Sequence, residues 1–341
     1  MTAPLLPEEA TVYNTRMNKV LLLLSILAVS MTVGCPAAAP PAGRPMVTEV
    51  QTLPWSGDGF RGRQLVSRHY RIFTTSASPS VVSSLPGFME AAHDNYLAVT
   101  GLAAKPVGER RQMYMMGSRQ EWAELTRSIV GRQARLYLGI EAGGYCYRGV
   151  CVFWDMGGVG GLSTASHEGM HQFLYHRLAD HLPMWLEEGL GTLAEGYQID
   201  GQWVKFTPGR NVSRFTDLRR AIVQDWWIAL PDLLPMDGGD AVKLGFTEKT
   251  VGYYGQVWAL GEFLRTDPRY SPGRARLLAD AEAGRLHKAL GMTPEALKRL
   301  YRRGRLYNKV VSLPLFKHYI TEDLAGFEKR YRAFAEKLVR L

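Results

Sequence analysis

Two histidines four residues apart, His167 and His171, constrain this sequence more than any other feature. The surrounding pattern predicts a helix over residues 163–180, ahead of Pro183. Residues four apart lie one above the other on a helix face, roughly 6 Å apart, so the two imidazoles can converge on one metal ion. Glu168 is rotated off that line, where a base for a metal-bound water belongs. The pattern therefore predicts a zinc site with Glu168 as its catalytic base.

The part of the chain around this motif is predicted to be mainly helical. Ser163 or Thr164 is expected to cap the motif helix. The glycines at 157–161 are expected to form a flexible connection before it, since no Gly-Lys-Ser or Gly-Lys-Thr follows them as in a phosphate loop. Further helices are expected at 184–197, 214–226, 251–265, 273–289, 294–303 and 321–339.

The preceding residues, 47–156, predict a small α+β unit. The expected elements are a strand at 69–75, a helix at 79–100, a strand at 111–116, a helix at 118–130 and hairpin strands within 136–154. We expect residues 157–270 to form the helical part that binds zinc, and residues 271–341 a basic helical C-terminal segment. The predicted fold class is therefore α+β, with a small sheet-containing unit before a mainly helical part.

A catalytic zinc ion needs a third protein ligand and an open position for water. In metzincins, a glycine three residues after the second histidine and a histidine six residues after it complete the pattern, but here those positions are Leu174 and Arg177. His176 and His181 lie at other offsets and are expected at the surface or at a helix end. The metzincin pattern is therefore absent.

The segment Trp-Leu-Glu-Glu-Gly-Leu-Gly at 185–191 resembles the Trp-Leu-Asn-Glu-Gly-Phe-Ala segment of the aminopeptidase N family of gluzincins. This resemblance implies that Glu188 is the third zinc ligand and that Glu187 replaces an asparagine. Glu187 is rotated by about 100° from Glu188 on a helix, so both cannot point equally at the metal. Glu195 matches a further glutamate of that family and is expected to orient a ligand histidine.

The resemblance to aminopeptidase N has limits. His171 and Glu188 are 17 positions apart, slightly fewer than in that family, and the Gly-x-Met-Glu-Asn motif that binds a free N-terminus is absent. Aminopeptidase activity is therefore not implied. From about His69 to Leu264, the order of elements and motifs is more similar to the bacterial family called domain of unknown function 1570, in the gluzincin (peptidase MA-like) group. That likeness implies a zincin-like fold without an established substrate.

The run Tyr-Gly-Gln-Val-Trp-Ala from Tyr254 matches the last element of that family. Peptide hydrolysis passes through an oxyanion that needs a hydrogen-bond donor beside the metal. In relatives of aminopeptidase N a tyrosine is that donor, and Tyr254 matches its position, although Val257 replaces a glycine of the pattern. Two alternatives stay open: that Tyr253 is the donor, or that Tyr254 is an ordinary core residue of an amphipathic helix.

The N-terminal residues 1–35 resemble a signal peptide. Residues 20–33 form a mostly apolar run, too short for the roughly 20 residues of a membrane-spanning helix, and Met17 is the expected true start. The run ends in Thr-Val-Gly-Cys, which resembles the lipobox of bacterial lipoproteins and implies a lipid on Cys35. Residues 36–46, rich in Pro, Ala and Gly, are expected to be a tether. We therefore expect an exported lipoprotein facing the periplasm or the cell surface.

Cys146 and Cys151 are the other two cysteines. They are close enough to close a small hairpin loop, which makes a disulfide possible in an exported protein. Two free thiols are the alternative. The pair cannot form a zinc site alone, because no second Cys or His pair has matching spacing.

The chain carries a formal net charge of +9, and the excess lies mainly in its tail. From Leu297 onward there are 12 Lys or Arg against 4 Asp or Glu. Apolar residues at helical spacing in 321–339 favour a packed amphipathic helix with a solvated basic face. No nucleic-acid motif is present, so no nucleic-acid partner is expected.

The sequence therefore predicts a zinc-dependent peptidase that acts on a peptide or protein substrate and is tied to a membrane by a lipid. Two alternatives stay open: a catalytically inactive, lipid-anchored binding or scaffold protein of zincin fold, and a basic cell-envelope binding protein without metal. The sequence indicates nothing about the oligomeric state.

Overall fold

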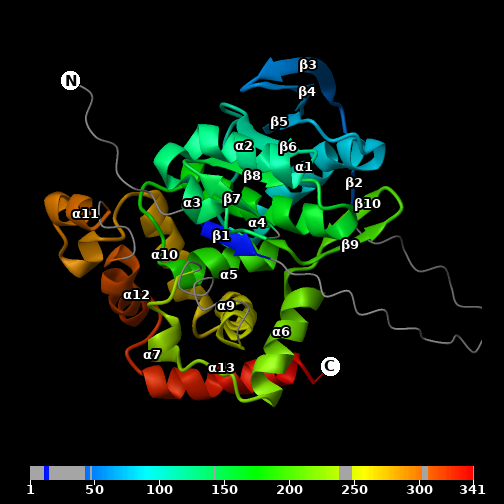
Figure 1. Cartoon of the computed structure of the whole chain (residues 1–341). Coiled ribbons are helices and arrows are strands. Elements are labelled where there is room, and N and C mark those ends of the chain that lie inside the picture. Colours follow the sequence, from blue (N-terminus) through cyan, green and yellow to red (C-terminus); the bar gives the residue numbers. More distant parts are fainter. Residues whose placement is uncertain are drawn as a thin grey trace, which may run out of the picture.

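The computed structural model describes residues 11–14, 43–46, 48–141, 143–237, 248–301 and 306–340. Met17, Cys35 and most of the expected tether lie outside the described residues. Figure 1 shows the sheet in one half of the molecule and most of the helices that follow the motif in the other. The α+β class is thus confirmed, with a small N-terminal sheet and a helical C-terminal part.

A seven-stranded mixed sheet has the order β1-β7-β8-β6-β5-β4-β3. Its strands are β1 (Thr11–Asn14), β3 (Gln51–Gly57), β4 (Phe60–Val66), β5 (Tyr70–Thr74), β6 (Arg111–Met116), β7 (Gly143–Tyr147) and β8 (Val150–Trp154). The central strands β5, β6 and β8 are parallel, and every other pairing is antiparallel. Parallel strands need crossover connections, which the intervening helices supply.

Helices cover both faces of this sheet. α1 (Pro79–Thr100) and α4 (Gly158–Arg177) pack on one face, and α2 (Arg119–Val130) and α3 (Ala134–Tyr137) on the other. The alternation of β8 shows this, because Cys151 and Phe153 belong to one core while Val152 and Trp154 belong to the second. The sheet thus positions α4, the motif helix, along strands β7 and β8.

The second half of the chain surrounds α9, which is buried on nearly all sides. Its helices are α5 (Met184–Ala194), α6 (Val212–Val223), α7 (Leu230–Leu233), α9 (Glu248–Thr266), α10 (Ser271–Glu282), α11 (Pro294–Tyr301), α12 (Leu306–Tyr319) and α13 (Leu324–Leu338). A small sheet joins β2 (Arg44–Pro45), β10 (Trp203–Phe206) and β9 (Tyr197–Asp200). α13 buries Phe327 and Tyr331 against Phe263 of α9, which confirms the packed amphipathic helix expected in the tail.

Several expected boundaries are wrong for identifiable reasons. α4 begins at Gly158, not at a Ser163 or Thr164 cap, so the glycines expected to be flexible form its first turn. Packing of the later turns outweighs the low helix propensity of glycine. α5 ends at Ala194 because the chain turns there into β9, so Glu195 is the C-cap and not an interior residue. The stretch expected to start hairpin strands at 136 is still helical in α3.

The elements β3, β4, β9, β10 and α12 were not among those expected from the sequence. β3 and β4 form a largely exposed ribbon, so they lack the apolar alternation by which a strand is recognised. The β9–β10 hairpin has strands of only four residues, most of them exposed. α12 contains Pro314, which reads as a helix breaker in a sequence, yet the helix continues through it.

A buried carboxylate fastens α1 to the turn between β4 and β5. Glu90 Oε1 accepts hydrogen bonds from Ser67 Oγ and from the His69 amide, each at 2.7 Å, and Oε2 lies 2.6 Å from His69 Nδ1. Burial alone would raise the pKa of Glu90, but the contacts with His69 and Ser67 lower it from 4.5 to about 2. The ionised form of Glu90 therefore stabilises the fold.

The stability of the protein should depend on this group in acid. Because the folded pKa of Glu90 is depressed, its contribution is complete above about pH 4.5 and is lost as the pH falls towards 2. The loss amounts to at most about 3 kcal/mol. Glu90→Gln should therefore flatten the dependence of the unfolding free energy on pH between 2 and 4.5, measured by urea denaturation. An unchanged slope in the variant would show that Glu90 is not responsible.

Candidate metal centre

Three predicted ligands meet at one buried point. His167 and His171 come from α4 and Glu188 from α5, and each side chain offers a ligand atom within 4.8 Å of the others. The two Nε2 atoms are 3.0 Å apart, and Glu188 Oε2 lies 3.4 Å from His167 Nε2. All three residues are at most 3% exposed. This is the only such group of three or more potential ligands among the described residues.

The geometry of this cluster fits a zinc ion. Ligands about 2 Å from a tetrahedral zinc lie roughly 3.3 Å from one another, close to the two distances observed. Neither carboxylate oxygen of Glu188 accepts a hydrogen bond of acceptable geometry, although both are buried. A buried carboxylate without hydrogen bonds is costly unless a cation compensates it. Two histidines and one glutamate form a donor set that catalytic zinc sites use.

Two glycines allow α5 to approach this closely. A Cβ at Gly191 would lie 2.8 Å from His167 Cε1, and a Cβ at Gly189 would lie 2.9 Å from the Val257 carbonyl oxygen of α9. Any larger side chain would push α5 away from α4 or α9. The glycines that cost α5 helical stability are therefore what brings Glu188 into reach of the histidines.

The carboxylate of Glu195 lies behind His167 and is held by two further residues, Arg214 and Asn211. Glu195 Oε1 lies 2.7 Å from His167 Nδ1, and Glu195 also accepts hydrogen bonds from Arg214 and from Asn211 Nδ2. Burial would raise the pKa of Glu195, but Arg214 and His167 lower it to about 2. With a metal ion bound, an ionised Glu195 would keep the proton of His167 on Nδ1 and leave Nε2 as the ligand atom. This contact agrees with the role expected for Glu195.

His171 has a carboxylate of its own. Glu187 Oε1 lies 3.2 Å from His171 Nδ1. Glu187 does not belong to the ligand cluster, as its rotation from Glu188 predicts. The sequence analysis does not predict the contact of Glu187 with His171, because the resemblance implies only that Glu187 replaces an asparagine. The sequence analysis does not identify Asn211 or Arg214 either. Asn211 could have been recognised as the N-cap of α6, whereas nothing in the sequence indicates that Arg214 is buried.

Glu168 lies beside the cluster with both carboxylate oxygens buried and without hydrogen bonds. Burial raises its pKa to about 7. The charge of an ion at the cluster would favour the ionised form again. A carboxyl group that exchanges its proton near neutral pH has the property that a general base needs.

Tyr254 is connected to Glu195 indirectly, through Arg214. It lies in α9, 2% exposed, with the Arg214 guanidinium 5.0 Å from its ring centroid. Arg214 in turn holds Glu195. The ring of Tyr253 packs 5.2 Å from that of Tyr254. Tyr254 as an oxyanion donor stays a prediction, and Tyr253 stays its alternative.

His176 and His181 lie outside the ligand cluster, as expected. His176 Nε2 is 3.1 Å from the Gly149 carbonyl oxygen, and both histidines are exposed.

The β7 edge of the sheet runs next to α4 and carries β1 as its outermost strand, with Thr11 opposite Cys146. Thr11–Asn14 fall within residues 1–35, the segment that the sequence predicts to be a signal peptide. A mature protein that begins at Cys35 would lack β1, and the hydrogen-bonding groups along β7 would then be open to another strand.

Cys146 and Cys151 are free thiols on directly opposed positions of β7 and β8. The connecting turn has positive φ at Arg148 and Gly149, which is typical of a two-residue hairpin turn. The cysteines are one step from its closing pair, at a non-hydrogen-bonded position with Cα atoms about 4.5 Å apart. That separation lies within the range of disulfides. Cys151 Sγ meanwhile donates to the Glu168 carbonyl oxygen at 3.1 Å.

Mild oxidation with a disulfide reagent should therefore link Cys146 to Cys151 within one chain. Mass spectrometry should show the loss of two hydrogens and protection from alkylation, and Cys151→Ser should show neither. If both thiols of the oxidised protein still react with the alkylating agent after unfolding, the pairing is wrong.

Among the described residues, no helix has the length and apolar character needed to cross a membrane. Comparisons with protein-family models, curated proteins and solved structures found no significant match to this chain.

Proposed function

We propose that this chain is a zinc-dependent peptidase of the gluzincin type with a zincin-like fold. One observation carries the proposal: Glu168, buried and without hydrogen bonds, lies beside the buried cluster of His167, His171 and Glu188. A structural metal site needs no such neighbour, because its ligands complete the coordination. An acid with a pKa near 7 beside a three-ligand site suits hydrolysis.

Each residue has a separate task in this proposal. His167, His171 and Glu188 would hold the zinc ion, and Glu195 and Glu187 would orient the two imidazoles. Bound zinc would supply a Lewis acid that polarises the peptide carbonyl and makes water more acidic. Glu168 would accept the proton of the attacking water and deliver it to the leaving amine. Tyr254 would donate a hydrogen bond to the developing oxyanion.

A mixture of diverse peptides tests this function directly. The zinc-loaded protein should cleave a subset of them, a chelator should stop cleavage, and added zinc should restore it. Mass spectrometry of the products would locate the cleaved bonds. Stoichiometric zinc without any cleavage would favour the inactive scaffold, and absence of zinc would favour the binding protein without metal.

We also propose that the protein is exported and anchored by a lipid on Cys35. The support is the apolar run at 20–33 and the Thr-Val-Gly-Cys sequence that ends it. Wild-type protein should then be recovered with membranes, and Cys35→Ser should be recovered in the soluble fraction, because one lipidated cysteine would carry the whole attachment. Membrane recovery of mature Cys35→Ser would place the anchor elsewhere, for example in the basic tail.

A further inference from the structure

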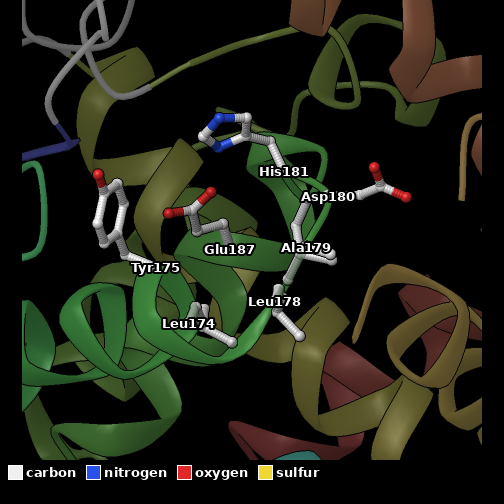
Figure 2. A pocket seen from close by; sticks show the side chains of 8 residues that line it. Leu174, Tyr175, Leu178, Ala179, Asp180, His181 and Glu187 are labelled. Atoms are coloured by element: carbon white, nitrogen blue, oxygen red, sulfur yellow. The ribbon is translucent and has the colours of Figure 1, made fainter. Parts of the chain in front are cut away.

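A cavity of about 260 Å³ opens next to the metal-binding cluster. It lies between the C-terminal end of α4 and the beginning of α5, and its lining residues are shown in Figure 2. Its apolar wall consists of Leu174, Leu178, Ala179 and Leu182. Pockets that enclose a whole drug-sized ligand usually measure about 300–1,000 Å³, so this cavity suits a single side chain.

One carboxylate faces this space. Figure 2 shows Glu187 projecting between Tyr175 and His181, whereas the carboxylate of Asp180 is turned away. Asp180 accepts a hydrogen bond from the Leu286 amide and lies 3.2 Å from His287 Nδ1. The side chain of Glu187 is 19% exposed. Its Oε1 is engaged by His171, but its Oε2 has no hydrogen-bond partner among the residues that the structure describes.

The cavity lies one helical turn beyond His171, because Leu174 and Tyr175 line it. Leu174 and Tyr175 follow His171 by three and four positions, so they continue its face of α4 towards the C-terminal end, and Leu178 is the C-cap that ends this helix. Glu187 touches both sites, because it contacts His171 and lines the cavity. A peptide with its scissile bond at the cluster would thus place a neighbouring side chain here.

We propose that this cavity is a specificity pocket for a lysine or arginine side chain of the substrate, with Glu187 as its counter-charge. The inference rests on the proposed peptidase function and names its substrate class. The aliphatic stem of a basic side chain packs against the leucines while its cationic end pairs with Glu187 Oε2. An apolar side chain would remove the free oxygen of Glu187 from water without giving it a partner, which costs binding energy.

Cleavage of a peptide library by the full zinc-loaded chain tests the selectivity. Cleaved bonds should carry Lys or Arg at one fixed position, with kcat/KM at least tenfold above that for Met. Glu187→Gln keeps an acceptor for His171 but removes the charge, so this ratio should fall to about one. Because the result is a ratio, a general loss of zinc or activity cancels. Glu124→Gln, exposed on α2 across the sheet, should keep the wild-type ratio.

A binding experiment separates this pocket from the peptidase function. Nα-acetyl-arginine amide and its neutral isostere Nα-acetyl-citrulline amide would be titrated by NMR into zinc-loaded Glu168→Gln protein. Arginine should bind at least tenfold more tightly, a difference of 1.4 kcal/mol, and the added Glu187→Gln substitution should abolish the difference. Arginine selectivity without cleavage of any peptide by the wild type would refute the peptidase and support the pocket. Cleavage without basic preference, or a preference that survives Glu187→Gln, would overturn the pocket and leave the peptidase standing.

Discussion

Glu168→Gln is expected to lower peptide hydrolysis by about 10² to 10⁴-fold, the range that a general base contributes, while zinc stays bound. The amide has the shape of the carboxyl group but cannot accept the proton of water. Because Glu168 is not one of the three clustered ligands, its loss should leave the metal content near that of the wild type. The measurements are kcat/KM on a peptide cleaved by the wild type and zinc content by metal analysis.

The same substitution should not harm the fold. Burial raises the pKa of Glu168, which means that its charged form is unfavourable where it lies. A neutral isostere removes that cost, so the metal-free variant should melt at or above the wild-type temperature at pH 8, where a buried carboxylate is ionised. Glu168→Asp, which keeps the acid but shortens its reach, should retain part of the activity. Unchanged turnover in Glu168→Gln would remove this residue from the mechanism.

The parts of the site that the sequence predicts are those governed by local geometry. The spacing of His167 and His171 requires only one helix, and helix spacing is fixed by the backbone. The prediction of Glu188 as the third ligand depends in addition on the resemblance to known segments, because no local pattern shows that α5 packs against α4. The close approach depends on Gly191, whose missing side chain leaves room for the His167 ring.

The parts that the sequence misses depend on contacts between distant segments. Arg214 reaches Glu195 from α6, and Glu187 reaches His171 across the turn between α4 and α5. Neither contact has a periodic pattern to reveal it. The same reason explains β3 and β4, which pair along their whole length although their residues, with one exception, are exposed or half-buried and show no apolar alternation. In each case these residues are of types that are common on protein surfaces, so their identity alone does not reveal the contact.

Loss of a ligand residue is expected to reduce zinc binding strongly. His171→Ala or Glu188→Ala removes one of three ligands, and each variant should lose most of its zinc during purification. Glu195→Ala removes the acceptor behind His167 and should weaken zinc binding by roughly 10 to 100-fold. Because Glu187 is rotated by about 100° from Glu188 on the helix, the sequence alone predicts that Glu187→Ala leaves the zinc affinity nearly unchanged. Its 3.2 Å contact with His171 changes that expectation to a loss of the same order as for Glu195, or smaller.

A competition titration of the four variants against a zinc chelator would rank these roles. His171→Ala and Glu188→Ala should bind zinc far more weakly than the other two. Glu195→Ala should be affected at least as much as Glu187→Ala, because Glu195 lies 2.7 Å from its histidine and is held by Arg214, whereas Glu187 lies 3.2 Å away and is partly exposed. A larger loss in Glu187→Ala than in Glu188→Ala would shift the ligand by one residue. Equal affinity in all variants would mean that the ion binds elsewhere, and the gluzincin interpretation would fail with it.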